Sequence, residues 1–83
     1  MSKVKLLAQA LAGSKNLRFR DFVRLVEAYG FRLSRTRGSH HIFSHAGVPE
    51  LLNLQEVDGK AKPYQVRQFL KLVEKYNMVL GEG

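Results

Sequence analysis

The apolar residues of this 83-residue chain change their spacing between Gly30 and Phe31, and that change limits the folds it can adopt. Up to Gly30 they recur every three or four residues, which predicts a helix with one apolar side. From Phe31 they alternate with polar residues, which predicts half-buried strands. A helix followed by strands in a short chain predicts an α+β fold. The helical stripe before the change comprises Phe19, Phe22, Val23, Val26 and Tyr29.

Three short strands are expected after this helix, joined by links that contain Gly, Ser or Pro. Such tight links make neighbouring strands antiparallel. The charged stretch at residues 56–62 contains an Asp-Gly turn, and we expect it to be a loop. The strands are predicted at residues 31–34, 40–44 and 50–55.

Two further helices are expected, one toward each end of the chain. Pro63 fits the first position of the last helix, where its missing N–H costs nothing, and the apolar stripe continues to Tyr76. The first helix is predicted at residues 4–11, where apolar residues again have helical spacing. The residues expected to dock this first helix on the domain are Val4, Leu7 and Leu11.

The chain is therefore predicted to be a single domain over residues 1–83. It divides into an N-terminal helical extension at 1–16 and a core at 17–80. The simplest packing places both long helices on one face of a three-stranded antiparallel sheet, and leaves the other face of the sheet open.

Composition narrows the possible partners. Fourteen Lys and Arg against seven Asp and Glu give a net charge of +7, which favours a polyanion, with nucleic acid ahead of a membrane surface. The chain has no cysteine, so disulfides, thiolate zinc sites and cysteine nucleophiles are excluded. No apolar run approaches the roughly 20 residues of a membrane span, and Gln9 interrupts the apolar part of the N-terminus. We expect a cytoplasmic protein without a signal peptide.

Basic residues form runs on both long helices, and each run has two interpretations. It is either a solvated helix face or a surface that contacts phosphates, and the sequence leaves the choice open. Two aromatic residues also have two interpretations each. Phe43 either stacks on bases or packs in the core, and Tyr64 either stacks on bases or caps the start of the last helix. The basic runs are Arg20 with Arg24, and Arg67 with Lys71 and Lys75.

The stretch RGSHHIF contains two adjacent histidines at the start of the second predicted strand. Strand alternation places His40 with Ile42 on one face, and His41 with Phe43 and His45 on the other. Because Ile42 is a natural core residue, we expect its face to be the one that the helices cover. His40 is then predicted to be buried, and His41 to point outward from the open face.

A metal site at these histidines is disfavoured by distance. His41 and His45 have the spacing at which two histidines share a metal on a helix. On a strand the same positions lie about 13 Å apart, from a rise of about 3.3 Å per residue. No acidic cluster lies nearby in the sequence, so we expect neither a metal nor another cofactor.

The order of the elements and four short motifs resemble the HicA family of bacterial and archaeal toxins, over residues 17–80. The resemblance implies an α-β-β-β-α core of the double-stranded-RNA-binding type. It also implies an mRNA interferase that cleaves RNA independently of the ribosome and is neutralised by a HicB antitoxin. The segment before Leu17 and the loop before the last helix are longer than in minimal members. The motifs are AYGF at 28–31, GSHHIF at 38–43, LNLQ at 52–55 and GKAKPYQVRQFL at 59–70.

The family's Gly-Ser-any-His motif falls on residues 38–41, so the resemblance implies that His41 is the catalytic histidine. An imidazole gives or takes a proton near neutral pH, and RNA carries its own nucleophile in the 2′-hydroxyl. Whether His41 acts as base or acid is left open, and no partner for a second proton step is evident. The residues expected to contact RNA are Arg35, Arg37, Lys60 and Lys62, with Gly38 and Ser39 shaping the site.

Three functions remain in competition. The leading one is a metal-independent endoribonuclease toxin of a type II toxin–antitoxin system, with RNA and a HicB-type antitoxin as partners. The second is an RNA-binding module that keeps the fold and the charge without catalysis. The third is a regulatory domain whose open sheet face binds a protein.

Overall fold

The structure is a computed structural model and describes residues 2–81. Both the α+β class and the α-β-β-β-α core predicted from the sequence are confirmed, with an additional helix before the core. The elements are α1 (Lys3–Leu11), α2 (Phe19–Ala28), β1 (Arg32–Arg37), β2 (His40–His45), β3 (Val48–Val57), β4 (Lys60–Ala61) and α3 (Pro63–Lys75).

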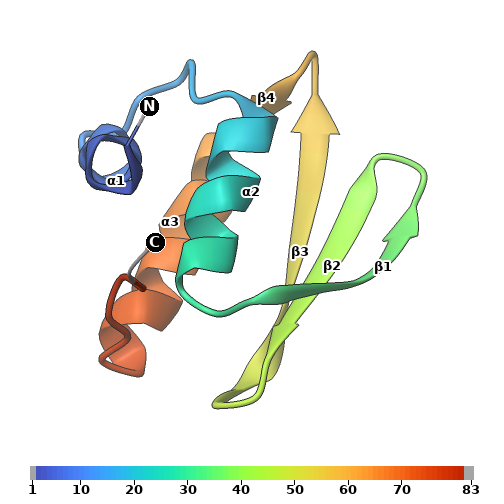
Figure 1. Cartoon of the computed structure of the whole chain (residues 1–83). Helices are drawn as coiled ribbons and strands as arrows, with labels where there is room; N and C mark the ends of the chain where they lie inside the picture. Colours follow the sequence, from blue (N-terminus) through green and yellow to red (C-terminus); the bar gives the residue numbers. More distant parts are fainter. Residues whose placement is uncertain (1, 82–83) are drawn as a thin grey trace.

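These elements form three layers (Figure 1). The sheet is one outer layer, α2 and α3 lie side by side against one of its faces, and α1 packs on α2 and α3 from the opposite side. The strand order is β1-β2-β3-β4, and every pair is antiparallel. The prediction that both long helices cover one face of the sheet is therefore confirmed.

The sheet has four strands, so the prediction of three was wrong by one short strand. Residues 56–62, expected to be a loop, instead continue β3 and return as β4, which pairs with Glu56 and Val57. Asp58 and Gly59 form the turn, with φ of 52° and 75°. Positive φ at two successive residues is what a two-residue hairpin turn of type I′ requires, and Asp-Gly is a favoured pair there.

Four aromatic rings hold the two long helices together above the sheet. The ring of Phe69 on α3 meets the rings of Phe22, Tyr29 and Phe31 edge-on, with centroids 5.5 to 6.0 Å apart. Edge-to-face pairs of this kind contribute about 0.5–1.5 kcal/mol each beyond the area they bury. The sheet contributes Phe43, Leu52 and Leu54 to the same core.

The choice between the two faces of β2 was predicted wrongly. Phe43 is the buried residue, at 1% exposure, whereas Ile42 is only half-buried. Both side chains are apolar, and the larger ring of Phe43 fills more of the space beneath the helices. His41 and His45 therefore share the helix-covered face with Phe43, and His40 and Ile42 lie on the open face.

The docking face of α1 was also predicted wrongly. Leu6 and Ala10 are the buried residues of this helix. Leu7 is partly buried, whereas Val4 and Leu11 are 68% and 66% exposed. Ser2 begins the helix, because its side-chain oxygen accepts a hydrogen bond from the Lys5 N–H at 3.2 Å.

Strand β1 lies at one edge of the sheet and is exposed along its whole length. Leu33, expected to point into the core, is 50% exposed, whereas Phe31 just before the strand is buried. The pairing of β1 with β2 shifts register between Leu33 and Arg35, which marks a bulge. Among residues 2–81, no helix combines the length and apolar character needed to cross a membrane.

Candidate functional site

His41 lies near the start of β2, paired with Thr36 of β1 and Leu54 of β3. Its ring packs against the ring of Phe19, the first residue of α2, with centroids 4.8 Å apart and planes inclined by 51°. Phe19 is almost fully buried, whereas His41 is half-buried. The imidazole thus borders the core on the helix-covered face and keeps part of its surface in solvent.

A backbone contact fixes which nitrogen of His41 carries the proton. The Nδ1 atom lies 3.1 Å from the carbonyl oxygen of Ser39, and a carbonyl oxygen only accepts hydrogen bonds. Nδ1 is therefore the donor, and in the neutral ring Nε2 holds the lone pair. The neutral ring can take a proton at Nε2, and the imidazolium can give one from the same atom.

The β1–β2 turn, formed by Gly38 and Ser39 and called the hairpin tip below, is held by hydrogen bonds on one side and open on the other. The Ser39 carbonyl oxygen also accepts from the Glu56 N–H at 3.1 Å, and the Ser39 hydroxyl oxygen accepts from Gln55 Nε2 at 3.3 Å. Gly38 has a φ of 57°, and no atom lies within 4 Å of where its Cβ would be. The Ser39 hydroxyl proton remains available to donate to a ligand.

Two of the predicted RNA-contacting residues lie on the opposite face of the sheet from His41. Arg35 is paired with Ile42, and Arg37 with His40. Residues directly opposite one another in an antiparallel pair point to the same face, so both arginines share the open face. The structure therefore does not bring them next to the His41 imidazole.

The β3–β4 hairpin carries the other two predicted cations and is tied to the start of α2. The Phe19 N–H donates to the Gly59 carbonyl oxygen at 2.9 Å, and the Ala61 N–H donates to the Leu17 carbonyl oxygen, also at 2.9 Å. Lys60 therefore lies at the same end of the molecule as the Phe19–His41 contact.

Lys60 and Lys62 differ in their surroundings. Lys60 is exposed, and its Nζ donates to Asn16 Oδ1 at 3.2 Å. Lys62 is half-buried at the start of α3, with its Nζ 5.6 Å from the centroid of the Tyr64 ring.

The sequence prediction missed two residues at this site, Phe19 and Arg18. Phe19 was assigned only to the core, although its ring also supports His41. Arg18 is exposed and directly precedes α2. Its backbone forms an isolated antiparallel β-bridge with that of Lys60. No signal in the sequence pairs Phe19 with His41, because 21 intervening positions separate them and only the tertiary packing brings them together.

The other histidines have different surroundings. His40, predicted to be buried, is exposed on the open face, and its Nδ1 lies 3.2 Å from Asn53 Oδ1. His45 accepts a hydrogen bond at Nδ1 from the Gly47 N–H at 2.8 Å, and its ring packs against Phe31 with centroids 5.2 Å apart. His45 therefore stabilises the turn after β2.

The structure also bears on the two aromatic residues considered for base stacking and on a possible metal site. Phe43 packs in the core, whereas Tyr64 is 47% exposed and accepts a hydrogen bond at its hydroxyl from Gln65 Nε2 at 3.3 Å. Within residues 2–81, no three His, Asp or Glu side chains gather in a way that would hold a metal ion.

The basic runs on the two long helices lie mostly in solvent. Arg20, Arg24, Arg67 and Lys71 are exposed. Lys75 forms an ion pair with Glu50, with Nζ 2.9 Å from Oε2, and the Tyr76 hydroxyl donates to the same carboxylate. The hydrogen bond from Tyr76 is the largest cause of a lowered pKa of Glu50, and the hydrogen bond from Lys75 is the second.

Comparison with known proteins agrees with this arrangement. A family described as the HicA toxin of bacterial toxin–antitoxin systems matches residues 19–74, which begin at the Phe19 ring beneath His41 and end in α3. Comparisons with curated proteins and with solved structures gave no match. Because the family match covers more than half of the chain, the protein belongs to the HicA toxin family.

Proposed function

We propose that this protein is an endoribonuclease toxin that cleaves mRNA without a metal ion, with His41 as its proton-transfer residue. The observation that supports this role is the hydrogen bond from His41 Nδ1 to the Ser39 carbonyl. That bond orients the ring and leaves the lone pair of the neutral imidazole on Nε2. This base is held in one tautomer and is partly open to solvent, on a domain whose net charge of +7 attracts RNA.

In the proposed reaction, His41 Nε2 takes the proton of a ribose 2′-hydroxyl. The 2′ oxygen then attacks the adjacent phosphorus, and the bond from phosphorus to the 5′ oxygen breaks. The products are a 2′,3′-cyclic phosphate and a 5′-hydroxyl, whose proton comes from the His41 imidazolium or from water. Either one imidazole serves both steps in turn or water serves the second, so we expect slow turnover by the standard of a ribonuclease with two catalytic groups.

Cations on the side of α2 and β4 are proposed to hold the reacting phosphate. Lys60 and Lys62 supply positive charge there, together with Arg18. The hairpin tip contributes the Ser39 hydroxyl and lets a nucleotide strand approach the backbone at Gly38. Positive groups aimed at a phosphate stabilise the negative charge that grows on its oxygens in the transition state.

Arg35 and Arg37 are proposed to bind the RNA strand where it passes around the hairpin tip to the open face. In that position they contribute affinity that depends on salt, because each phosphate contact releases condensed counterions. The other proposed partner is a HicB-type antitoxin that is acidic at its contact surface. An mRNA substrate implies that both act in the cytoplasm.

The test compares wild type with His41→Ala and His41→Gln on single-stranded RNA in EDTA. Loss of general acid–base catalysis should reduce the cleavage rate by about 10² to 10⁴-fold. RNA binding should change less than about twofold, since the ring is one group among many cationic side chains. Fragment ends are identified by mass, with a 2′,3′-cyclic phosphate expected.

His40→Ala is the matched control, because it removes the neighbouring imidazole from the opposite face of the same strand. Its cleavage rate and melting temperature should stay close to those of wild type, since His40 is exposed. Equal cleavage by His41→Ala and wild type would refute the catalytic role. Binding without cleavage by folded wild type would favour the RNA-binding module.

A further inference from the structure

One edge of the sheet is left partly without a neighbour. Strand β4 pairs with β3 only at Glu56 and Val57. Within the part of the chain that the structure describes, no strand lies beside residues 48–55 of β3 on that side. We call this stretch the free edge of β3.

The hydrogen bonds at the upper end of β3 show which backbone groups face the free edge. The Glu56 N–H points toward β2 and donates to the Ser39 carbonyl at 3.1 Å. The Gln55 N–H points the opposite way and donates to Gln65 Oε1 at 2.8 Å. Successive residues of a strand direct their backbone groups to alternate sides, so Asn53 presents its N–H and C=O groups to the free edge. The β2–β3 register shifts between Phe43 and His45, but burial still alternates along residues 48–54 of β3, so Leu51 presents its groups to the same side as Asn53. Such groups are a template for another strand.

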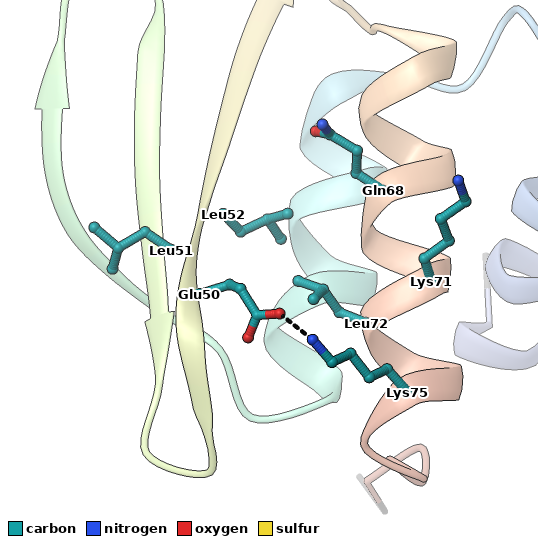
Figure 2. A pocket seen from close by; sticks show the side chains of 7 residues that line it. All are labelled: Glu50, Leu51, Leu52, Gln68, Lys71, Leu72 and Lys75. Atoms are coloured by element: carbon teal, nitrogen blue, oxygen red, sulfur yellow. Dashed lines mark hydrogen bonds and ion pairs between the residues drawn. The ribbon is translucent and has the colours of Figure 1, made fainter.

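A groove of about 370 Å³ runs between the free edge and α3 (Figure 2). Leu52 and Leu72 point toward each other across it and supply apolar surface. Lys71 and Lys75 border it on the helix side, and the charge of Glu50 is offset by its ion pair with Lys75. The groove therefore has an apolar floor and a net positive wall.

Leu51 extends from the opposite face of β3 and is 62% exposed. A strand added along the free edge would place alternate side chains in two different environments. One set would meet the lysines of the groove, and the other would lie beside Leu51 on the open face. That environment suits a segment in which acidic and apolar residues alternate.

We propose that the free edge of β3 binds an extended, acidic segment of a partner protein as a fifth strand. Backbone bonds to Leu51 and Asn53 supply affinity, and Lys71 selects acidic side chains, because the charge of Lys75 is already paired with Glu50. A second copy of this chain fits less well, because pairing β3 with itself would bring the lysines of two α3 helices, and two chains of charge +7, together. This binding site is separate from His41 and does not depend on RNA cleavage.

The test uses a blocked nine-residue peptide of alternating glutamate and valine as the probe, followed by amide hydrogen exchange in the ¹⁵N-labelled protein. We expect exchange of the Leu51 and Asn53 amides to slow at least about tenfold when the peptide is bound, because two new backbone hydrogen bonds protect them. A peptide with lysine in place of glutamate should not bind. Methylating alternate amide nitrogens of the glutamate peptide should abolish binding without any change in the protein.

Matched variants locate the site. Leu51→Pro removes an N–H that faces away from β2, so the existing ladder is kept and peptide protection should be lost; Leu51→Val keeps the N–H and should retain it. Lys71→Glu should weaken peptide binding at least about threefold more than Lys5→Glu, which makes the same charge change on α1.

Three outcomes would overturn the proposal. The first is equal binding of the lysine peptide, and the second is a shift of the Ile42 side-chain methyl signals on the open face without protection of the Leu51 and Asn53 amides. The third is a wild-type dimer in light scattering that Leu51→Pro dissociates, which would assign the free edge to a second copy.

Discussion

His41 and His45 lie four residues apart on the same face of β2, and their hydrogen bonds place the proton on different ring nitrogens. The Nδ1 atom of His41 donates to a carbonyl, whereas the Nδ1 atom of His45 accepts from the Gly47 N–H. His41 therefore keeps a basic nitrogen at Nε2, and His45 uses its lone pair inside the protein. A single backbone contact at each ring therefore distinguishes His41, a candidate catalytic group, from His45, a structural one.

Gly30 allows the His45 ring to occupy its position. A Cβ at Gly30 would lie 2.9 Å from His45 Nε2, and the φ of Gly30 is +94°. Gly13 has a similar positive φ of +76°, but nothing lies within 4 Å of its Cβ position. We predict that Gly13→Ala costs about 1–2 kcal/mol for backbone strain alone, and that Gly30→Ala costs at least about 1 kcal/mol more because it also displaces the ring.

Urea unfolding of the two variants measures this difference in free energy. Adding His45→Ala to Gly30→Ala should recover part of the loss, since the smaller side chain removes the clash. Equal destabilisation by Gly13→Ala and Gly30→Ala would show that the contact with His45 carries no cost.

At the scale of elements, helix α1 depends on one leucine. Leu6 is fully buried against the core, whereas Leu11 is 66% exposed. We predict that Leu6→Ala costs about 2–5 kcal/mol, the range for a leucine truncated in a core. Leu11→Ala removes the same atoms from an exposed position and should cost less than about 0.5 kcal/mol.

Thermal unfolding checks this pair, and deleting residues 1–13 should lower the melting temperature at least as far as Leu6→Ala does. For a domain of this size, 2 kcal/mol corresponds to roughly 8 °C or more. A truncated chain that melts with the full-length protein would make α1 an independent appendage.

Helix positions followed from the sequence because their apolar spacing extends over several turns, as from Phe19 to Tyr29. Faces were harder to predict wherever apolar residues are adjacent. In α1, Leu6 and Leu7 are both apolar, and in β2 the same is true of Ile42 and Phe43. A period of two then fits either face, and the decision depends on which side chain fills the space beneath the helices.

The candidate site was predictable in part, for a related reason. The Gly-Ser-any-His motif drew attention to His41, but its support by Phe19 is a tertiary contact. His41 lies on the helix-covered face of β2 and not on the open face that was predicted. Arg35 and Arg37 are paired with Ile42 and His40 on the open face, so they lie on the opposite side of the sheet from His41. Strand β4 was missed because a two-residue strand has no period to detect.

At the scale of the whole molecule, the contact of Glu50 with Tyr76 and Lys75 ties the lower part of β3 to the end of α3. These hydrogen bonds lower the pKa of Glu50 below its usual 4.5. A carboxyl group with a lowered pKa in the folded state stabilises the fold above about pH 4.5. That stabilisation is lost as the pH falls through the folded-state pKa.

We therefore predict that Glu50→Gln lowers the melting temperature at pH 7, and that its difference from wild type shrinks toward pH 3. Melting curves across this range provide the measurement. Glu74→Gln makes the same charge change at an exposed position of α3 and serves as the control. A difference from wild type that stays constant from pH 7 to pH 3 would mean that the Glu50 charge contributes nothing.

The exposed, bulged strand β1 has a consequence for how large an assembly this sheet can build. Its arginines and its register shift make that border a poor match for any incoming backbone, since charge and irregular pleating both discourage continued pairing. Only the opposite border is then suited to growth. A complex formed through the sheet should therefore take up its added strand at the free edge of β3 and leave β1 unpaired on its outer side.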